Sequence, residues 1–566
     1  MEIEIKIDEK IIKNAYYTFI ILFFLIFSFL IFYNNLSVVW NYPIVFGDEG
    51  YHMRISKEFA LRKEYLHYLD FIQPNPSAYG YISIFHFLEA FGFLISESFA
   101  KFLLPLIIFV TSFSIFVIFW KIFDEKIALL SSILFQTFQS TIIYSVTFYV
   151  DSLFVLFIFL SFSFLFLFLK ENKIEYYFLS SIFLGLSFIV KPTLPFAISF
   201  GIIFLVFYYY FLRKINFKEL LMFFLFPIFT ILSLIVFNIL AYNKICVGFW
   251  IITEILNKYL GGSCEIKNIE YKDIYSFAGR TEQIGSEVDV FSFGLKEYID
   301  FAYGYSSFII LSSIIGIFIL IYHKRYELLF PLIPFFLLTV VWLIIIYPFS
   351  NDLGVLYRTE DTARYLYFLN PFIALYSSLF LYSLKEILDL IKNARNSSIV
   401  KIVFLLIFLI SLFIITYYFF ISYSFKLEIM KRVKTFSEYF FEACNYIKEK
   451  TERNTTIMSL WGYRVLYACE RNIGGTADLR LSNNSTFINE LAKNFGIDYF
   501  FVEKFSIDPL NRNLSEMYNL DWVKLLLNSK EYFEIFYENG VPINDCINNY
   551  LLRGMPCDGV IIFKIK

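Results

Sequence analysis

Residues 46–54 read FGDEGYHMR and come directly after the first long apolar run of the chain, residues 16–33. The stretch places the adjacent carboxylates of Asp48 and Glu49 where a chain that crosses a bilayer emerges into water. Charged groups at that depth are costly unless they face a polar cavity, so they are candidates for function. An ordinary solvated loop start is the alternative. We favour a functional site because most other long loop-to-helix junctions in this chain are less polar. The other polar side chains of the stretch are Tyr51, His52 and Arg54.

The composition is typical of a membrane protein with many helices. Hydrophobic residues make up 58% of the chain and charged residues 17%, whereas soluble domains carry about 25% charged residues. Apolar runs long enough to cross a bilayer recur through most of the sequence, which predicts a polytopic α-helical membrane protein. The N-terminus lacks a small-residue cleavage site, so we expect the first run to be a retained helix. A net charge of -2 gives no reason to expect nucleic acid as a partner.

The apolar runs predict about eleven membrane spans. Their approximate ranges are 16–38, 100–120, 127–148, 152–170, 176–190, 193–212, 218–241, 302–322, 327–348, 367–384 and 400–422. The segment 80–97 is apolar but contains His86 and Glu89, so we expect a re-entrant or interfacial helix there. The fifth and sixth spans share one apolar run, which we divide at Lys191-Pro192 because proline ends a helix.

Lysine and arginine side chains near the span ends set the expected orientation. They gather in alternate loops, and these loops are cytoplasmic if the N-terminus is cytoplasmic. The opposite side then holds 39–99, the turns at Asp151 and Lys191, 242–301, 349–366 and everything after 422. We therefore expect a multi-pass protein of a cell membrane whose C-terminal residues lie outside.

All six cysteines fall in segments that we expect to lie outside. An even number confined to an oxidising compartment suggests disulfides, although scattered free thiols are the alternative. Cys246–Cys264 and Cys546–Cys557 are plausible local pairs, but spacing alone does not fix the connectivity. The remaining cysteines are Cys444 and Cys469.

Residues 423–566 carry ordinary charge, contain no spanning run and are long enough to form a core of their own. Helical patterning covers 434–450 and 485–495, and it alternates with strand-like runs. The strand-like runs are 456–460, 498–502 and 559–563. This alternation predicts a small exoplasmic α/β domain. We therefore divide the chain into a transmembrane domain, 1–422, and an exoplasmic domain, 423–566.

Groups of polar residues converge on the expected outer face. They are residues 48–54, the aspartate Asp151, the lysine Lys191 and the charged segment RTEDTARY at 358–365. Carboxylates at such a site can remove a proton from an acceptor hydroxyl, and arginine or lysine can hold a phosphate. Together they predict transfer of a group from a lipid phosphate carrier to an acceptor. No HExxH, GxSxG, Walker A or paired CxxC motif competes with this interpretation.

Several of these groups also have a purely structural explanation. Asp151 can cap the helix that follows it, which is compatible with a catalytic role and about equally well supported. Lys191 can extend its ammonium group to the membrane interface, which the sequence favours slightly over a ligand contact. The segment 358–365 can be a solvated charged loop.

These residues resemble the GT-C fold glycosyltransferases that use polyprenyl-phosphate-linked sugars, a group that includes protein O-mannosyltransferases and lipid A aminoarabinose transferases. Asp48-Glu49 matches the Asp-Glu pair in the first outer loop of those enzymes. Residues 73–92 look like the proline-rich stretch and the short apolar segment ending in Phe-Gly that follow that pair. Asp151 matches a lone aspartate in the second outer loop. The remaining matches are Gly185-Leu186 to Lys191-Pro192, and Arg364-Tyr365 with Pro371, so the ordered set runs across residues 16–422.

The resemblance implies an inverting glycosyltransferase in which Asp48 is the general base that activates the acceptor. Glu49 would orient the acceptor or support Asp48, and Asp151 would be a second acidic group in the cavity. The candidates for binding the carrier phosphate are Arg54, Lys191, Arg358 and Arg364. Tyr51, His52 and Tyr365 complete the expected substrate-binding set. Gln73 stands where some members carry a lysine that meets the phosphate, so the cation must come from elsewhere.

The expected partners are a polyprenyl-phosphate-linked sugar and a protein, lipid or glycan acceptor, and the sequence leaves the sugar and the acceptor open. Residues 48–54 also resemble the Asp-x-x-Tyr-His-x-Arg motif of oligosaccharyltransferase catalytic subunits. Those subunits carry Trp-Trp-Asp-Tyr-Gly in the outer domain, where this chain reads LWGYR at 460–464 without the aspartate. No second carboxylate accompanies Asp151, so we expect no metal cofactor and rank oligosaccharide transfer second. A transporter or a non-enzymatic scaffold is a further alternative, but the charges cluster at one face and no repeat is visible.

Overall fold

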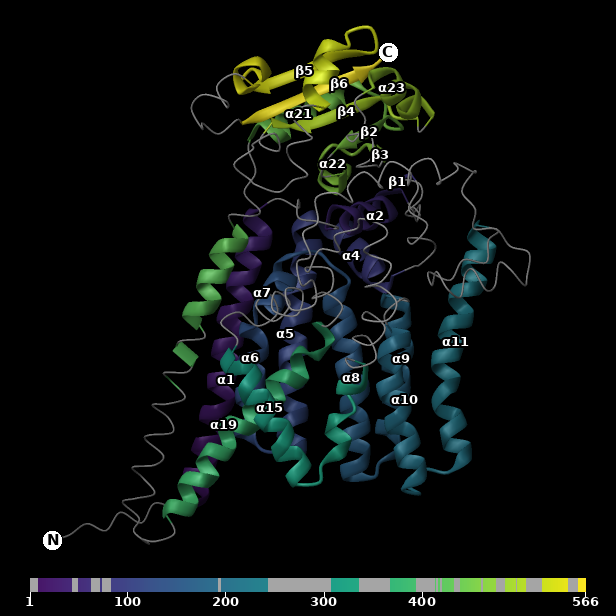
Figure 1. The fold of residues 1–566 in the computed structure, drawn as a ribbon. Coiled ribbons are helices and arrows are strands. Elements are labelled where there is room, and N and C mark those ends of the chain that lie inside the picture. Colours follow the sequence, from purple (N-terminus) through teal and green to yellow (C-terminus); the bar gives the residue numbers. More distant parts are fainter. Residues whose placement is uncertain are drawn as a thin grey trace, which may run out of the picture.

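The computed structural model describes a bundle of helices and a mixed sheet that lies beyond one end of the bundle (Figure 1). The described residues are 9–42, 49–62, 72–73, 83–191, 195–242, 307–334, 367–392, 413, 416–417, 420–431, 438–459, 462–474, 484–494, 496–504, 522–547 and 558–566.

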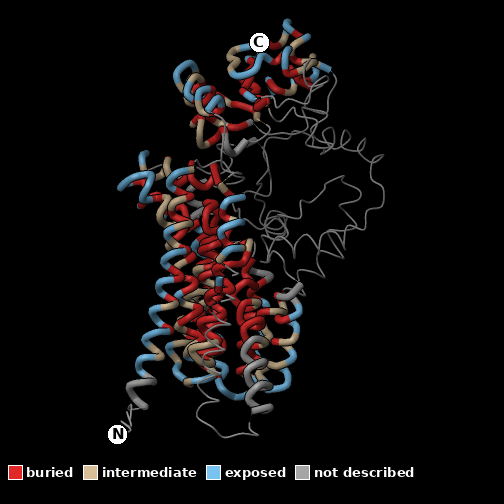
Figure 2. Tube along the Cα trace, turned by 90° about the vertical axis from the view of Figure 1, so that its left-hand side faces the viewer, coloured by how far each residue is buried: buried red, intermediate tan, exposed pale blue. Residues whose placement is uncertain are grey.

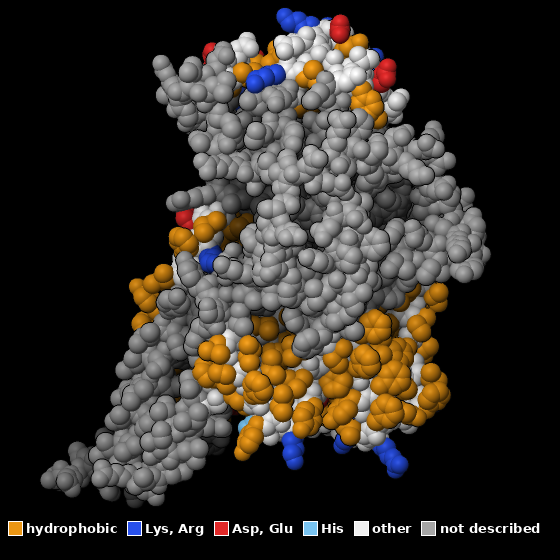
Figure 3. Space-filling view, in the orientation of Figure 1, with side chains coloured by type: hydrophobic (Ala, Val, Ile, Leu, Met, Phe, Trp, Pro, Cys, Tyr) orange, Lys and Arg blue, Asp and Glu red, His pale blue; other side chains and the backbone are white. Residues whose placement is uncertain are grey.

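Apolar helices run along one another and form the bundle. Their bounds are α1 (Glu9–Asn41), α5 (Glu97–Ile122), α6 (Glu125–Thr137), α7 (Gln139–Val146), α8 (Asp151–Glu171), α9 (Ile174–Val190), α10 (Pro195–Phe211), α11 (Phe217–Tyr242), α15 (Ser307–Tyr322) and α19 (Asn370–Lys392). Among the described residues, 4 helices are long and apolar enough to cross a membrane, or up to 5 if a bent pair counts as one span. Buried residues fill the interior of the bundle (Figure 2). Apolar side chains form a broad band on its surface, with lysine and arginine side chains at the lower edge (Figure 3). These helices are those of a multi-pass membrane protein.

Most predicted spans that fall on described residues are helices. The predicted ranges 16–38, 100–120, 152–170, 176–190, 193–212, 218–241, 302–322 and 367–384 correspond to α1, α5, α8, α9, α10, α11, α15 and α19. The division at Lys191 is confirmed, because α9 ends just before it and α10 begins shortly after it. The predicted spans 327–348 and 400–422 lie largely outside the described residues. The first of these begins with a 3-10 turn, η3 (Tyr326–Leu329).

The predicted span 127–148 is not one straight helix. Its two parts, α6 and α7, meet at Phe138 and are bent by 62°. Phe138 has an extended backbone with ψ of 139°, which interrupts the helical hydrogen bonds. Asn370 of α19 donates hydrogen bonds to the hydroxyls of Ser140 and Thr141, at 2.7 and 3.1 Å, and so holds α7 in its bent position. Polar residues flank Phe138 in the stretch QTFQST at 136–141, but the hydropathy of the whole run 127–148 did not reveal the break.

Two short helices lie between the bundle and the sheet: α2 (Glu49–Arg62) and α4 (Ile84–Ile95) (Figure 1). α4 has 12 residues. A helix of that length rises about 18 Å, well short of the hydrocarbon core of about 30 Å. The predicted helix in 80–97 is therefore present and too short to cross. Ser83 caps it, because its Oγ accepts a hydrogen bond of 3.2 Å from the Phe85 N–H.

The sheet has 6 strands in the order β1-β3-β2-β4-β6-β5. Their bounds are β1 (Ile72–Gln73), β2 (Thr456–Ser459), β3 (Asn472–Gly474), β4 (Tyr499–Glu503), β5 (Phe533–Gly540) and β6 (Gly559–Ile565). The pairs β1–β3, β3–β2 and β2–β4 are parallel, whereas β6 is antiparallel to both β4 and β5. The strands predicted at 456–460, 498–502 and 559–563 are present as β2, β4 and β6. β1 comes from the first predicted outer segment, so the sheet includes residues from both sides of the predicted boundary at 422/423.

Side chains alternate across the sheet at its central strand, β4, which is buried along its whole length. Tyr499 and Phe501 pack with Phe440 of α21 (Glu438–Lys450) and with α22 (Gly462–Ala468). Phe500 and Val502 pack on the opposite face, in a cluster that includes α23 (Ser485–Asn494). A fully buried strand between two helical layers is the arrangement that its continuous apolar sequence favours.

A disulfide joins Cys444 of α21 to Cys469, which directly follows α22. It is neither of the local pairs that the sequence suggested. Cys546 is also disulfide-bonded, whereas Cys246, Cys264 and Cys557 lie outside the described residues. The Cys444–Cys469 bond ties the two helices on one face of the sheet together.

We expect the double substitution Cys444→Ala/Cys469→Ala to lower the free energy of unfolding of the sheet unit by about 2–4 kcal/mol, because a cross-link restricts the unfolded chain. Circular dichroism melting of the purified protein, with and without reductant, measures this. Reductant should lower the melting temperature of the wild type more than that of the double variant, which keeps only the disulfide of Cys546 among the described cysteines. Equal melting temperatures for wild type and variant under oxidising conditions would contradict the expectation.

Candidate active site

The segment that contains α2 contacts the connection between α7 and α8 through Glu49. α2 begins at this residue, directly after Asp48, which itself lies outside the described residues. The Glu49 side chain is fully buried. Its Oε1 accepts a long hydrogen bond of 3.4 Å from the backbone N–H of Phe148. Phe148 lies in the short connection between α7 and α8, so these two segments, far apart in the sequence, come together at one end of the bundle.

Asp151 and Lys191 form a buried ion pair. The Lys191 Nζ lies 2.7 Å from the Asp151 Oδ1, and the two side chains are only 10% and 2% exposed. Asp151 is the first residue of α8, and Lys191 directly follows the last residue of α9. Two of the predicted polar groups therefore contact each other. A buried pair of this kind is costly to break from one side, because the remaining charge is left without compensation.

The structural alternatives for these two residues are not what the molecule uses. The cap position of α8 is Val150, which makes no side-chain cap bond, and Asp151 lies one residue inside the helix. Lys191 is buried and directed at a carboxylate, so its ammonium does not extend to an interface. The two side chains bind one another instead.

α4 adds polar residues that the sequence noted only as interruptions of an apolar run. His86 Nε2 and His52 Nδ1 lie 2.8 Å apart, and one of the two rings donates to the other. Ser56 donates a hydrogen bond of 2.8 Å to Glu89 Oε2. Ser83 donates to the Val190 carbonyl at 2.9 Å, directly before Lys191. His86 and Glu89 stand three residues apart in an apolar helix, and that spacing puts both on the face toward α2.

Tyr51 and Arg54 of α2 point toward the sheet unit. Tyr51 is buried in the apolar cluster of that unit, and its ring also lies 6.2 Å from the ring of His86. Arg54 forms an ion pair of 3.0 Å with Glu58 and donates to the Leu466 carbonyl at 3.5 Å. The predicted substrate-binding residues within 48–54 therefore face two different helices. His52 faces α4, whereas Tyr51 and Arg54 face α22.

The remaining predicted site residues lie outside the described residues. They are Asp48, Arg358, Arg364 and Tyr365. Gln73 lies in β1 at the edge of the sheet. Within the described ranges, no group of three or more histidine, cysteine, aspartate and glutamate side chains is arranged to hold a metal ion.

We expect Lys191→Met to destabilise the protein by about 3–5 kcal/mol, because it leaves the Asp151 carboxylate buried without a partner. The double variant Lys191→Met/Asp151→Asn should lose less than the sum of the single variants, since neither charge is then left alone. Thermal unfolding in detergent measures both. Lys173→Met, which removes the exposed lysine of the Lys173–Glu171 pair, is the matched control and should change nothing measurable. Strictly additive losses would contradict the coupling.

Part of the chain matches the model of a known protein family. The family model "Dolichyl-phosphate-mannose-protein mannosyltransferase" matches residues 82–240, which run from α4 to α11 and include Asp151 and Lys191. A search of curated protein sequences found no match.

Solved structures share the fold at low identity. The apo oligosaccharyltransferase of Archaeoglobus fulgidus superposes with a TM-score of 0.58 at 12% identity and covers 96% of this chain and 88% of that chain. AglB of the same organism, in complex with an inhibitory peptide and a dolichol-phosphate, superposes at 0.54 with 12% identity and the same coverage, 96% and 88%. ArnT of Cupriavidus metallidurans bound to undecaprenyl phosphate gives 0.48 at 10% identity, covering 87% and 95%. The family match over residues 82–240 agrees with the resemblance seen in the sequence, and the apo oligosaccharyltransferase shares the fold along most of this chain.

Proposed function

We propose that this protein transfers a sugar from a polyprenyl-phosphate donor to an acceptor on the outer side of the membrane, with inversion at the anomeric carbon. The observation that carries the proposal is the meeting of Glu49, the Phe148 amide and the Asp151–Lys191 pair at one end of the bundle. Glu49, which follows Asp48, contacts the chain three residues before Asp151, and Asp151 binds the buried ammonium of Lys191. Carboxylates and a cation at one end of the bundle suit acid–base chemistry beside a phosphate.

In this mechanism Asp48 is the general base. It takes the proton of the acceptor hydroxyl while the acceptor oxygen forms a bond to the anomeric carbon. The bond between that carbon and the phosphate oxygen breaks, and the polyprenyl phosphate leaves with its negative charge. Buried Glu49, which directly follows Asp48 in the sequence, fixes the start of α2 by accepting the hydrogen bond from Phe148.

Lys191 is our first candidate for binding the carrier phosphate among the described residues. The Asp151 carboxylate holds its ammonium in one position, at 2.7 Å, inside the protein. Arg54, Arg358 and Arg364 remain further candidates, and Tyr51, His52 and Tyr365 are proposed substrate contacts. The Asp151–Lys191 contact also bears on metal binding, because an ammonium beside a carboxylate repels a divalent cation at that carboxylate.

We further propose that the N-terminus is cytoplasmic and that the sheet unit lies outside as an exoplasmic α/β domain above about eleven spans. Lysine and arginine side chains at the end of the bundle remote from the sheet support this orientation (Figure 3). The Cys444–Cys469 disulfide supports an oxidising environment for the sheet unit.

Oligosaccharide transfer is the second candidate function. The likeness to the Archaeoglobus oligosaccharyltransferase favours it, because that likeness covers 96% of this chain and so includes the sheet unit. One structure of that enzyme is tethered to an acceptor peptide containing the NVT sequon. A peptide acceptor and a dolichol-type donor therefore belong among the substrates to be tested.

We expect Asp48→Asn to reduce transfer about 100- to 10,000-fold, since a positioned general base contributes that much. The assay is transfer from a panel of radiolabelled polyprenyl-phosphate sugars, with and without EDTA. Asp545→Asn in the sheet unit, at an exposed position, is the matched control and should retain full activity.

The outcomes of this assay test the assignment of Asp48 as the base and the dependence of transfer on metal. Full activity in a correctly inserted Asp48→Asn protein would overturn the assignment of the base. Transfer that survives EDTA in the wild type supports metal-independent sugar transfer. Transfer that EDTA abolishes favours the oligosaccharyltransferase-like mechanism.

A further inference from the structure

α2 belongs to two hydrophobic cores at once. Its residues Tyr51 and Ile55 are buried in the apolar cluster of the sheet unit, together with Leu466 of α22. Met53 is buried in the cluster of the helical bundle. The strand that follows α2 in sequence, β1, pairs with β3 of the sheet through Ile72. The first outer segment is therefore part of the sheet unit and also part of the bundle.

A carboxylate on α2 binds cations from both sides of this junction. Glu58 lies 3.0 Å from Arg54 and 3.1 Å from Arg62, one helical turn away in either direction. It also forms an ion pair with Arg453, which follows α21 in the sheet unit. The Glu58 side chain is only 4% exposed, so its carboxylate is shielded from solvent, and the contact with buried Arg54 is worth more than a surface pair.

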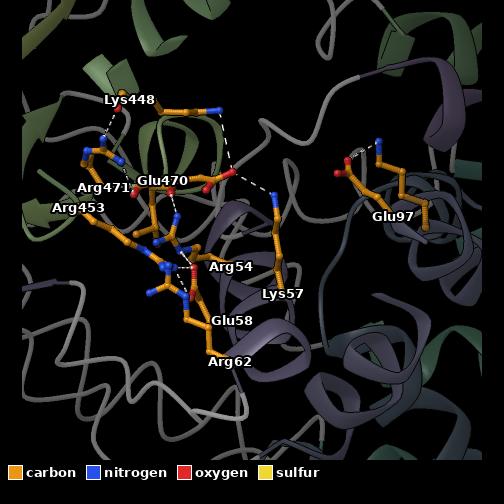
Figure 4. A network of polar contacts seen from close by, with 11 residues as sticks. Arg54, Lys57, Glu58, Arg62, Glu97, Lys448, Arg453, Glu470 and Arg471 are labelled. Atoms are coloured by element: carbon orange, nitrogen blue, oxygen red, sulfur yellow. Dashed lines mark hydrogen bonds and ion pairs between the residues drawn. The ribbon is translucent and has the colours of Figure 1, made fainter. Parts of the chain in front are cut away.

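A second carboxylate lies on the sheet unit and binds a cation of α2. Glu470, just after α22, lies 3.1 Å from Lys57 of α2 and 3.9 Å from Lys448 of α21 (Figure 4). The Lys57 ammonium also lies over the ring of Tyr467, 5.5 Å from its centroid. Burial raises the pKa of Glu470, but the hydrogen bond from Lys57 and the charges of Lys57 and Lys448 outweigh it and lower the pKa below its usual value.

The surfaces that these carboxylates join are both basic. α2 contributes Arg54, Lys57 and Arg62, and the sheet unit contributes Lys448, Arg453 and Arg471 (Figure 4). Arg471 is held by backbone carbonyls at the end of α21, including Lys448 at 2.7 Å. Without Glu58 and Glu470, like charges would face one another across a partly buried contact, which is unfavourable. We call these two carboxylates and their cations the docking network.

We propose that Glu58 and Glu470 are positioning residues for sugar transfer, which hold the sheet unit against α2 and thereby fix Glu49, the first residue of that helix. This inference rests on the proposed function. α2 is a single helix from Glu49 to Arg62, so a shift of its docked end moves its catalytic end. Misplacing a reacting group by about 1 Å is enough to lower a rate about 100-fold. The docking network therefore makes the activity depend on the position of the sheet unit.

The test asks whether a covalent link between α2 and the sheet unit can replace the ion pairs of Glu58 and Glu470. We would replace Lys57 and Glu470 by cysteine, combine them with Glu58→Gln, and bridge the two cysteines with a bis-maleimide whose spacer spans one Lys–Glu ion pair. Without the reagent we expect kcat to fall about tenfold or more while donor binding is unchanged. With the reagent we expect kcat to rise to the value of the cross-linked Lys57→Cys/Glu470→Cys variant, which retains Glu58. A merely structural role of Glu58 predicts no such rescue.

Two controls accompany this experiment. Glu534→Gln removes an exposed pair with Lys566, at 3.6 Å in the same sheet unit, and should leave kcat unchanged. The wild type treated with the same reagent reports any effect on native cysteines. Of these, Cys444, Cys469 and Cys546 are already disulfide-bonded.

Hydrogen exchange provides a readout that needs no transfer. We expect amides of α22 and β3 to exchange faster in Glu58→Gln, in Glu470→Gln and in the double variant than in the wild type. Unchanged exchange and unchanged kcat in the double variant would overturn the proposal, as would failure of the cross-link to restore kcat. Faster exchange in a protein whose wild type transfers no sugar would overturn the proposed function and leave the docking role of the two carboxylates supported.

Discussion

An ammonium group and a carboxylate, buried together where α8 begins and α9 ends, fix the end of the bundle that lies next to the sheet. The Lys191–Asp151 pair, with 2.7 Å between the charged atoms, joins the first residue of α8 to the residue that follows α9. The residue before Lys191 offers its carbonyl to Ser83, which caps α4. α4 in turn holds α2 through His86 and Glu89. The position of the whole first outer segment follows from this series of contacts.

Burying this much charge is expensive for a membrane protein, and the cost has to be offset locally. Glu49 begins a helix, where a negative charge is stabilised by the amide dipoles. Asp151 and Lys191 neutralise each other, and Glu58 is surrounded by arginines. Each of these three carboxylates, Glu49, Asp151 and Glu58, thus has its own compensation. The arrangement keeps charged groups, and hence polar chemistry, possible at one end of the helical bundle.

The sequence predicted the parts of this structure that depend on local pattern. Spans follow from hydropathy, the end of α9 from Lys191-Pro192, and three of the strands from short apolar runs. It also grouped Asp151 and Lys191 on one face, although only the folded chain shows that they pair. Features that depend on contacts between distant residues were missed. The bend at Phe138 is held by Asn370, and β1 is a strand only because β3 lies beside it. Cys444 pairs with a cysteine 25 residues away, and Arg54, a candidate for phosphate binding, is paired with Glu58.

The pairing of β1 with β3 has a consequence for how the protein is made. Residues 72–73 leave the ribosome long before the residues 472–474 that they pair with. Tyr51 and Ile55 likewise pack into a core that is complete only after Val560 and Ile562 have been synthesised. Until then the first outer segment carries unpaired backbone groups and exposed apolar side chains, the kind of surface on which chaperones act. Completion of the last strand thus closes a structure that the first outer segment began, and long-range contacts of this type form slowly.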